Sequence, residues 1–139
     1  MASTLQRLPV FAAALWWGSL TTIGFLVVPL LFMHLPTPAL AGGMAAKLFT
    51  AQTWVSVACG GILLLISTSK QASAPAQRAH DAIIFILLGL LLALLVEFAV
   101  APRIVTRTNL KLWHSVGSVM YLVQWLCAAI VFWRITPKQ

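Results

Sequence analysis

Residues 82–101 read AIIFILLGLLLALLVEFAVA, a run in which Glu97 is the only charged side chain. An α-helix rises 1.5 Å per residue, so about 20 apolar residues are enough to cross the hydrocarbon core of a bilayer. Three further stretches have the same apolar character, at residues 11–33, 49–67 and 112–133. The sequence therefore predicts four membrane-spanning helices that together take up most of its 139 residues.

The composition supports a membrane protein. Hydrophobic residues make up 61% of the chain and charged residues 8%, whereas about a quarter of the residues in a typical soluble domain are charged. The net charge of +7 comes from nine basic residues, which lie in termini, connections and span edges, against Asp81 and Glu97. No segment outside the spans is long enough to build a basic face for nucleic acid. We expect the lipid bilayer as the partner, and no nucleic acid.

The connections between the spans are short, at residues 34–48, 68–81 and 102–111. Short connections join antiparallel neighbours, which predicts an all-α, up-down-up-down four-helix transmembrane bundle in a single domain, residues 1–139. The first span is longer than the apolar core of a secretion signal, so we expect it to remain as a helix. Residues 69–79, rich in Ala, Ser and Gln, are expected to form a flexible surface connector.

The distribution of basic residues bears on the orientation in the membrane. Four crossings place both termini and the second connection on one membrane face, whose basic residues are Arg7, Lys70, Arg78, Arg134 and Lys138. The basic residues of the opposite face are Lys47, Arg103, Arg107 and Lys111. The positive-inside rule thus favours cytoplasmic termini by a single residue.

Glu97 needs a physical reason, because a carboxylate in the hydrocarbon region costs a few kcal/mol unless it finds a partner or water. One reading is a structural carboxylate, either paired with Arg103, Arg107 or Lys111 of the third connection or hydrogen-bonded to a neighbouring helix. The other is a proton, metal or substrate role, since intramembrane acids are frequent at functional sites. Pro29 lies at a similar depth in the first span and predicts a kink there.

The fourth span carries a stripe of polar and aromatic side chains. His114, Ser118, Tyr121 and Gln124 or Trp125 recur at spacings of three and four residues, which places them along one side of a helix. We expect this stripe to face the bundle interior. It serves either as a set of interhelical hydrogen bonds or as a path for a substrate.

A polar site is predicted at the membrane face of the first and third connections. Glu97, His114, Arg103 and Tyr121 are its candidate ligand or proton-binding residues. Arg103 would attract an anion or balance Glu97, and His114 would exchange a proton near neutral pH. His34 and His114 lie at matching depth and are candidate metal ligands, for haem or copper. The alternative for both histidines is a hydrogen bond to headgroups, water or a helix end.

Short motifs spread over essentially the whole chain carry a resemblance to a known family. They are Trp17-Gly18, Pro29, Leu31-Phe32, Leu35, Phe49, Pro102-Arg103-Ile104 and Leu112-Trp113-His114 with Ser118. In these motifs the chain resembles the membrane family called domain of unknown function forty-one forty-nine. That family includes a vertebrate transmembrane protein associated with drug resistance, and it is distantly similar to copper-resistance D type and haem-handling four-helix proteins. The resemblance implies a four-helix fold in a bacterial inner membrane, and it transfers no established activity.

The sequence favours a non-enzymatic function. It contains no Ser-His-Asp set, no phosphate-binding glycine loop and no metalloprotease spacing. We expect an accessory subunit of a membrane complex, or a tolerance or transport factor for small molecules or ions, acting with a protein partner or as a homo-oligomer. The alternative is a haem- or copper-binding membrane oxidoreductase with His34 and His114 as ligands.

Overall fold

A computed structural model describes residues 2–69 and 73–137 of the chain, nearly all of them helical. The elements are α1 (Ala2–Thr22), η1 (Ile23–Val27), α2 (Val28–His34), α3 (Pro38–Ser67), α4 (Ala74–Asp81), α5 (Ile83–Leu95), η2 (Val96–Val100), α6 (Ala101–Val105) and α7 (Leu110–Ile135). Here η1 and η2 are short π-helical segments within longer helices. Within the described residues, four continuous helices are long and apolar enough to cross a membrane: Gln6–His34, Pro38–Ser67, Ile83–Val105 and Leu110–Ile135.

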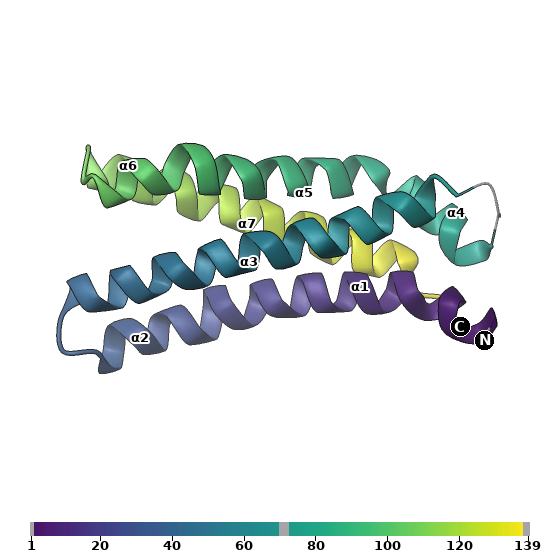
Figure 1. Cartoon of the computed structure of the whole chain (residues 1–139), viewed down its shortest axis with the longest axis horizontal. Helices are drawn as coiled ribbons and strands as arrows, with labels where there is room; N and C mark the ends of the chain where they lie inside the picture. Colours follow the sequence, from purple (N-terminus) through teal and green to yellow (C-terminus); the bar gives the residue numbers. More distant parts are fainter. Residues whose placement is uncertain (1, 70–72, 138–139) are drawn as a thin grey trace.

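The four long helices form the predicted bundle (Figure 1). The chain runs along α1 and α2, returns along α3, runs out again through α5 and α6, and returns along α7, so that both termini lie at one end. We call α1 to α3 the first hairpin and α5 to α7 the second hairpin. The all-helical membrane fold expected from the sequence is confirmed.

The first connection is much shorter than the sequence analysis expected. The Thr37 side chain accepts a hydrogen bond from the backbone N–H of Leu40, and Pro38 occupies the first turn of α3. Such a cap followed by proline is a favoured helix start. Helix α3 therefore begins at Pro38, and only residues 35–37 join the two helices of the first hairpin.

The second connection contains a helix where a flexible connector was expected. The Ser73 side chain caps α4 by accepting a hydrogen bond from the backbone N–H of Ala76. Ala76 and Ala79 are buried, and α4 packs against α1, α3 and α7. An amphipathic helix thus covers the end of the bundle that carries the termini. Lys70 and Lys138, which entered the charge comparison of the two membrane faces, lie outside the described residues.

Each π-helical segment ends two residues before a proline. The N–H of Val28 bonds to the carbonyl of Ile23 before Pro29, and the N–H of Ala101 bonds to the carbonyl of Val96 before Pro102. Proline lacks an N–H, and its ring clashes with the carbonyl four residues earlier in a regular α-helix. A wider turn at that point accommodates the ring, so both helices continue through their prolines.

This continuation changes the depth of Glu97. The helix of the third span ends at Val105 instead of Ala101. At 1.5 Å per residue, Glu97 lies about 12 Å from the end of its helix, twice the distance that an end at Ala101 would give. Glu97 also lies inside η2, and π-helical turns occur frequently at functional sites.

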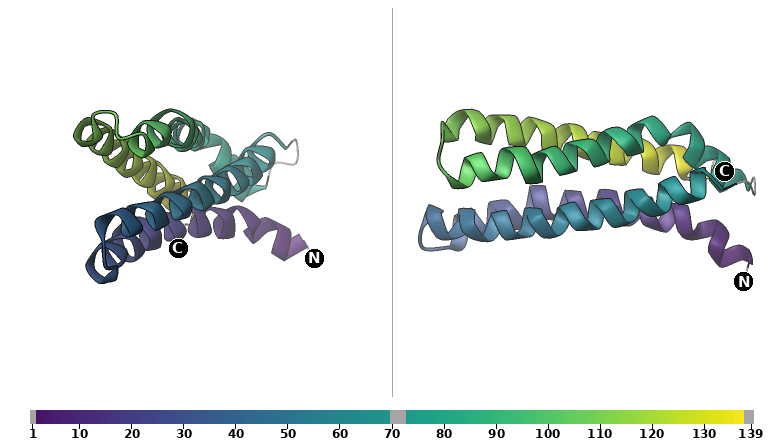
Figure 2. Two further views of the ribbon diagram at one scale, coloured as in Figure 1. Left: turned by 60° about the vertical axis from the view of Figure 1, so that its left-hand side comes forward. Right: turned by 45° about the horizontal axis from the view of Figure 1, so that its top comes forward.

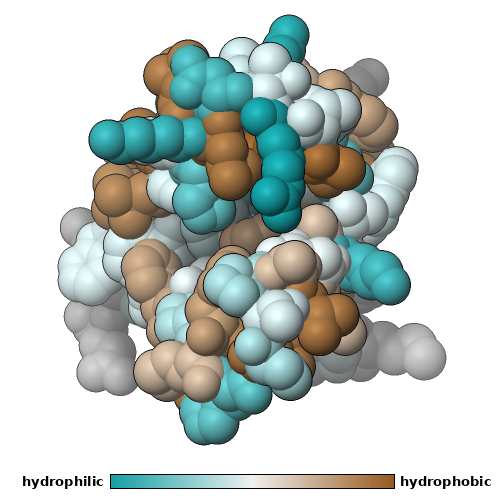
Figure 3. Space-filling view, turned by 90° about the vertical axis from the view of Figure 1, so that its left-hand side faces the viewer, coloured by the Kyte–Doolittle hydropathy of each residue, from teal (hydrophilic) through white to brown (hydrophobic). Residues whose placement is uncertain are grey.

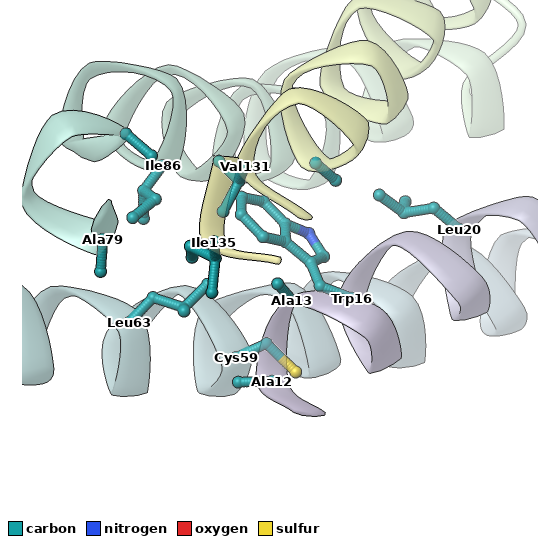
Figure 4. Close-up of a cluster of buried hydrophobic side chains, with 12 residues drawn as sticks. Ala12, Ala13, Trp16, Leu20, Cys59, Leu63, Ala79, Ile86, Val131 and Ile135 are labelled. Carbon is teal, nitrogen blue, oxygen red and sulfur yellow. The ribbon is translucent and has the colours of Figure 1, made fainter. Parts of the chain in front are cut away.

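The two ends of the bundle are packed differently. We call the end with α4 and the termini the closed end, and the end with residues 35–37 and 106–109 the open end. Around Trp16, Leu63, Ile86 and Val131, buried apolar side chains from α1, α3, α5 and α7 meet in the half next to the closed end (Figure 4). Toward the open end the two hairpins diverge (Figures 1 and 2).

The divergence leaves side chains near the open end without a common core. None of the residues of η1, α2 and α6, all of which the structure describes, is buried. Helix α2 packs on α3 and α6 packs on α7, each within its own hairpin. The surface at this end is hollowed between the hairpins, and hydrophilic side chains stand beside apolar ones around the hollow (Figure 3).

Candidate functional site

Glu97 lies in η2 of the second hairpin, is half-buried, and faces α3 of the first hairpin. The Thr50 hydroxyl on α3 lies 2.9 Å from Oε1 and 3.1 Å from Oε2 of Glu97, and it donates to this carboxylate. Thr50 belongs to the first hairpin and Glu97 to the second. The contact therefore joins the hairpins through one hydroxyl. Each carboxylate oxygen of Glu97 keeps a lone pair that can accept a hydrogen bond from a further donor.

Arg103 does not serve as the counter-charge of Glu97. Its Nη1 donates to the carbonyl oxygen of Ala99 at 2.7 Å, and its guanidinium lies over the Trp113 ring, 4.4 Å from the ring centroid. Glu97 makes no ion pair with any basic residue among those that the structure describes. Of the two structural alternatives that the sequence left open, Glu97 adopts the hydrogen bond to a neighbouring helix, from Thr50 on α3, and not the pairing with a basic residue of the third connection.

His34 and His114 are both exposed at the open end, on different hairpins. The Nδ1 atom of His34 lies 3.0 Å from the carbonyl oxygen of Leu30 in its own helix. Among the described residues, no three His, Cys, Asp or Glu side chains gather as a metal site. The helix ends that carry the two histidines lie apart in Figures 1 and 2, so the haem or copper hypothesis rests on the sequence.

Tyr121 ties the two hairpins together closer to the middle of the bundle. Its hydroxyl donates to the carbonyl oxygen of Leu20 on α1 at 2.7 Å. Its ring meets Phe49 edge to face, with ring centroids 5.2 Å apart, and lies directly against Gly24, where a Cβ atom would overlap the ring. The lack of a side chain at Gly24 therefore allows this approach.

Trp125 makes a second link from α7 to α1, in which Nε1 donates to the Thr21 hydroxyl oxygen at 2.8 Å.

The stripe predicted on the fourth span splits into two parts. Tyr121, Gln124 and Trp125 face neighbouring helices, whereas His114 and Ser118 are exposed. The reason for the difference is the divergence of the hairpins at the level of His114.

A buried polar cluster lies at mid-bundle, formed by Ser19, Gln52, Ser56 and Gln124. Gln124 Nε2 donates to the Ser56 hydroxyl oxygen at 3.0 Å, and Gln52 Nε2 donates to the Ser19 hydroxyl oxygen at 2.9 Å. Gln52 is 2% exposed, yet its Oε1 atom has no hydrogen-bond partner. Helices α1, α3 and α7 contribute to this cluster. It lies next to the apolar core, on the side of the open end.

The comparisons with known proteins give a family. Residues 11–112 match the family described as Domain of unknown function (DUF4149), which is more than half of the chain. The chain belongs to the DUF4149 family. No curated protein and no solved structure matches it. The matched range covers the positions of Thr50, Glu97 and Arg103, whereas His114 and Tyr121 follow it.

The structure adds residues that the sequence analysis of this DUF4149 member missed. Thr50 and Gln52 both lie in the predicted second span, where the run Thr50-Ala51-Gln52-Thr53 is a polar interruption. Such a run signals interhelical hydrogen bonds in a membrane helix. Its partners could not be deduced, because the rotation of α3 against its neighbours decides which side chains meet.

Proposed function

We propose that this DUF4149 member is a non-enzymatic membrane protein that binds a small cationic amphiphile between its hairpins, and that it acts as a tolerance or transport factor for such molecules. The observation that carries the proposal is the environment of Glu97. This carboxylate faces the space between diverging hairpins, and Thr50 is its hydrogen-bond partner. One neutral hydroxyl does not balance the charge of a carboxylate at this depth, so a cation beside Glu97 would be favourable.

The distribution of polar and apolar groups supports binding from one side. Polar side chains extend from the open end through Glu97 to the cluster around Gln52, and the core beyond them is apolar. A ligand that enters between the hairpins can place its apolar part among lipid-facing side chains and its charge beside Glu97. The apolar core near the closed end would stop it from passing through a single copy. Transport would therefore need an oligomer or a conformational change.

The role of the open-end rim follows from its charges. Arg103, Arg107 and Lys111 are exposed there, and the exposed Lys47 lies deeper, nine residues after the start of α3. Cations in water are therefore repelled, while cations dissolved in the lipid can reach Glu97 laterally. The proposal therefore favours hydrophobic cations over small inorganic ones.

A binding measurement with the lipophilic cation tetraphenylphosphonium tests the proposal. The purified protein in lipid nanodiscs should bind this cation, and Glu97→Gln should weaken binding by about tenfold or more, which corresponds to about 1.4 kcal/mol. Thr22→Val is the control, because the exposed Thr22 hydroxyl bonds within its own helix, to Gly18. Equal affinity of the wild type and Glu97→Gln would refute the proposal.

The same preparation tests the accessory-subunit and haem or copper hypotheses. Native mass spectrometry would reveal a stoichiometric partner chain, which would favour the role of an accessory subunit. An absorption spectrum and a metal analysis would reveal haem or copper. A Soret band or bound copper that disappears in His114→Ala would replace the proposed function by an oxidoreductase.

A further inference from the structure

The closed end carries a pocket that the proposed function does not use. It has a volume of about 660 Å³ and is lined by Arg78, Asp81, Trp133, Arg134, Thr136 and Pro137. Helix α4 supplies Arg78 and Asp81, and the last turn of α7 supplies Trp133 and Arg134. The pocket lies where the spans end, at the depth of the headgroups in a bilayer.

One charged group of the lining, the Arg134 guanidinium, is held in place by neighbouring residues. Arg134 Nη1 donates to the backbone carbonyl of Asp81 at 3.2 Å, and its guanidinium lies 5.0 Å from the Phe85 ring centroid. These contacts hold one guanidinium against α4 and leave the Asp81 carboxylate unpaired by it. The Asp81 Oδ1 atom has only a long contact, 3.5 Å, with Gln77 Nε2.

Arg78 is the second cation of the pocket. It is half-buried, and it makes no hydrogen bond or ion pair with any other residue that the structure describes. The pocket thus holds two guanidinium groups and one carboxylate, all with free hydrogen-bonding capacity. A ligand that matches them carries an anionic group with several acceptor oxygens and, next to it, a cationic hydrogen-bond donor.

We propose that this pocket binds the headgroup of a phosphatidylethanolamine lipid, with the phosphate on Arg78 and Arg134 and the primary ammonium on Asp81. Arginine recognises phosphate through paired N–H donors. The Asp81 carboxylate can accept hydrogen bonds from the N–H groups of a primary ammonium, whereas the quaternary ammonium of choline has no N–H to donate. The side chain of Trp133 is 82% exposed, as is usual for a tryptophan at a membrane interface, and it borders the pocket where the acyl chains would leave it.

Lipid retention measured by native mass spectrometry tests this proposal. The protein is placed in nanodiscs with equal amounts of phosphatidylethanolamine, phosphatidylcholine and phosphatidylglycerol, and released under increasing collision energy. We expect phosphatidylethanolamine to be retained at least about fivefold over phosphatidylcholine. A preference for phosphatidylglycerol, or no preference at all, would show a merely cationic surface and overturn the proposal.

Two variants separate the charges of the pocket. Asp81→Asn should abolish the preference for ethanolamine over choline while retention of phosphatidylglycerol stays the same or rises. Arg78→Gln should lower retention of phosphatidylethanolamine and phosphatidylglycerol together. Arg107→Gln at the open end is the matched control, and it should change neither the preference for ethanolamine over choline nor the retention of the two lipids. An unchanged lipid ratio in Asp81→Asn contradicts the assignment of the ammonium.

Folding and the source of the phosphate need separate checks. Arg134 joins α7 to α4, so its substitution could loosen the bundle, and the test therefore uses Arg78 and Asp81. The thermal melting of both variants should stay within a few degrees of the wild type. Soluble glycerophosphoethanolamine and inorganic phosphate, added at millimolar concentration, should leave lipid retention unchanged. Displacement by phosphate alone would show a site for a free anion.

Discussion

The indole of Trp16 rests on α5 at Gly89, where a Cβ atom would lie 2.8 Å from two ring carbons. Trp16 is completely buried in the core near the closed end. The pair joins α1 of the first hairpin to α5 of the second through a contact that any side chain at position 89 would obstruct.

Gly89→Ala should therefore destabilise the bundle. The large Trp16 ring is enclosed by buried neighbours, so the new methyl group forces a shift of side chains or backbone, at a cost of about 1 to 3 kcal/mol. Reversible unfolding in mixed detergent micelles measures the change. Gly61→Ala in α3 is the control, since a Cβ there meets nothing within 4 Å. Equal stability of the two variants would refute the packing argument.

The fold followed from the sequence to a large extent because the membrane restricts the choices. In the hydrocarbon core every backbone N–H and C=O must bond within its own helix, so an apolar run of sufficient length becomes a helix. Helix α3 nevertheless begins at Pro38, where Thr37 and Pro38 already form a recognisable start signal. The π-helical segments before Pro29 and Pro102 are different, because the proline indicates a distortion without fixing its form.

The candidate site was predictable only in part. Glu97 stands out in any hydropathy analysis, because a lone acid in an apolar run is rare. Its partner Thr50 belongs to another helix, and the pairing depends on how α3 and α5 are rotated and shifted against each other. The same dependence explains why the sequence could not separate the inward Tyr121 from the exposed His114 on one stripe. Whether these residues bind a ligand stays a prediction.

Thr50→Val should weaken the fold and strengthen cation binding. The valine keeps the shape of threonine and removes the hydroxyl that donates to Glu97, which should cost about 1 kcal/mol of stability. The freed carboxylate should then bind tetraphenylphosphonium more tightly than in the wild type. Calorimetric titration in nanodiscs measures the affinity. Thr22→Val serves as control, because the exposed Thr22 hydroxyl bonds within its own helix, to Gly18.

A lower cation affinity in Thr50→Val would contradict this account. It would show that the hydroxyl belongs to the binding surface and does not compete with the ligand for Glu97.

Tyr121→Phe should distinguish a structural tyrosine from a ligand-binding one. The change removes the hydrogen bond to the Leu20 carbonyl and keeps the ring on Phe49 and Gly24. We expect a loss of about 0.6 to 1.7 kcal/mol in stability, with unchanged affinity for tetraphenylphosphonium. Ser118→Ala, which removes an exposed hydroxyl bonded within α7, should leave both quantities unchanged. A large loss of affinity with unchanged stability would assign Tyr121 to the ligand site.

The buried polar cluster gives a direct measure of polar coupling between α3 and α7. Gln124 donates to Ser56, and both side chains are buried. A double-mutant cycle of Ser56→Ala and Gln124→Leu should therefore yield a coupling free energy of about 0.6 to 2 kcal/mol in unfolding experiments. Ser115→Ala paired with Gln124→Leu is the control and should be additive, because the exposed Ser115 hydroxyl bonds to Lys111 in its own helix. Additivity in the first pair as well would mean that packing alone holds the two helices together. The hydrogen bonds of the cluster would then fix the orientation of α3 and α7 without adding to the stability of the bundle.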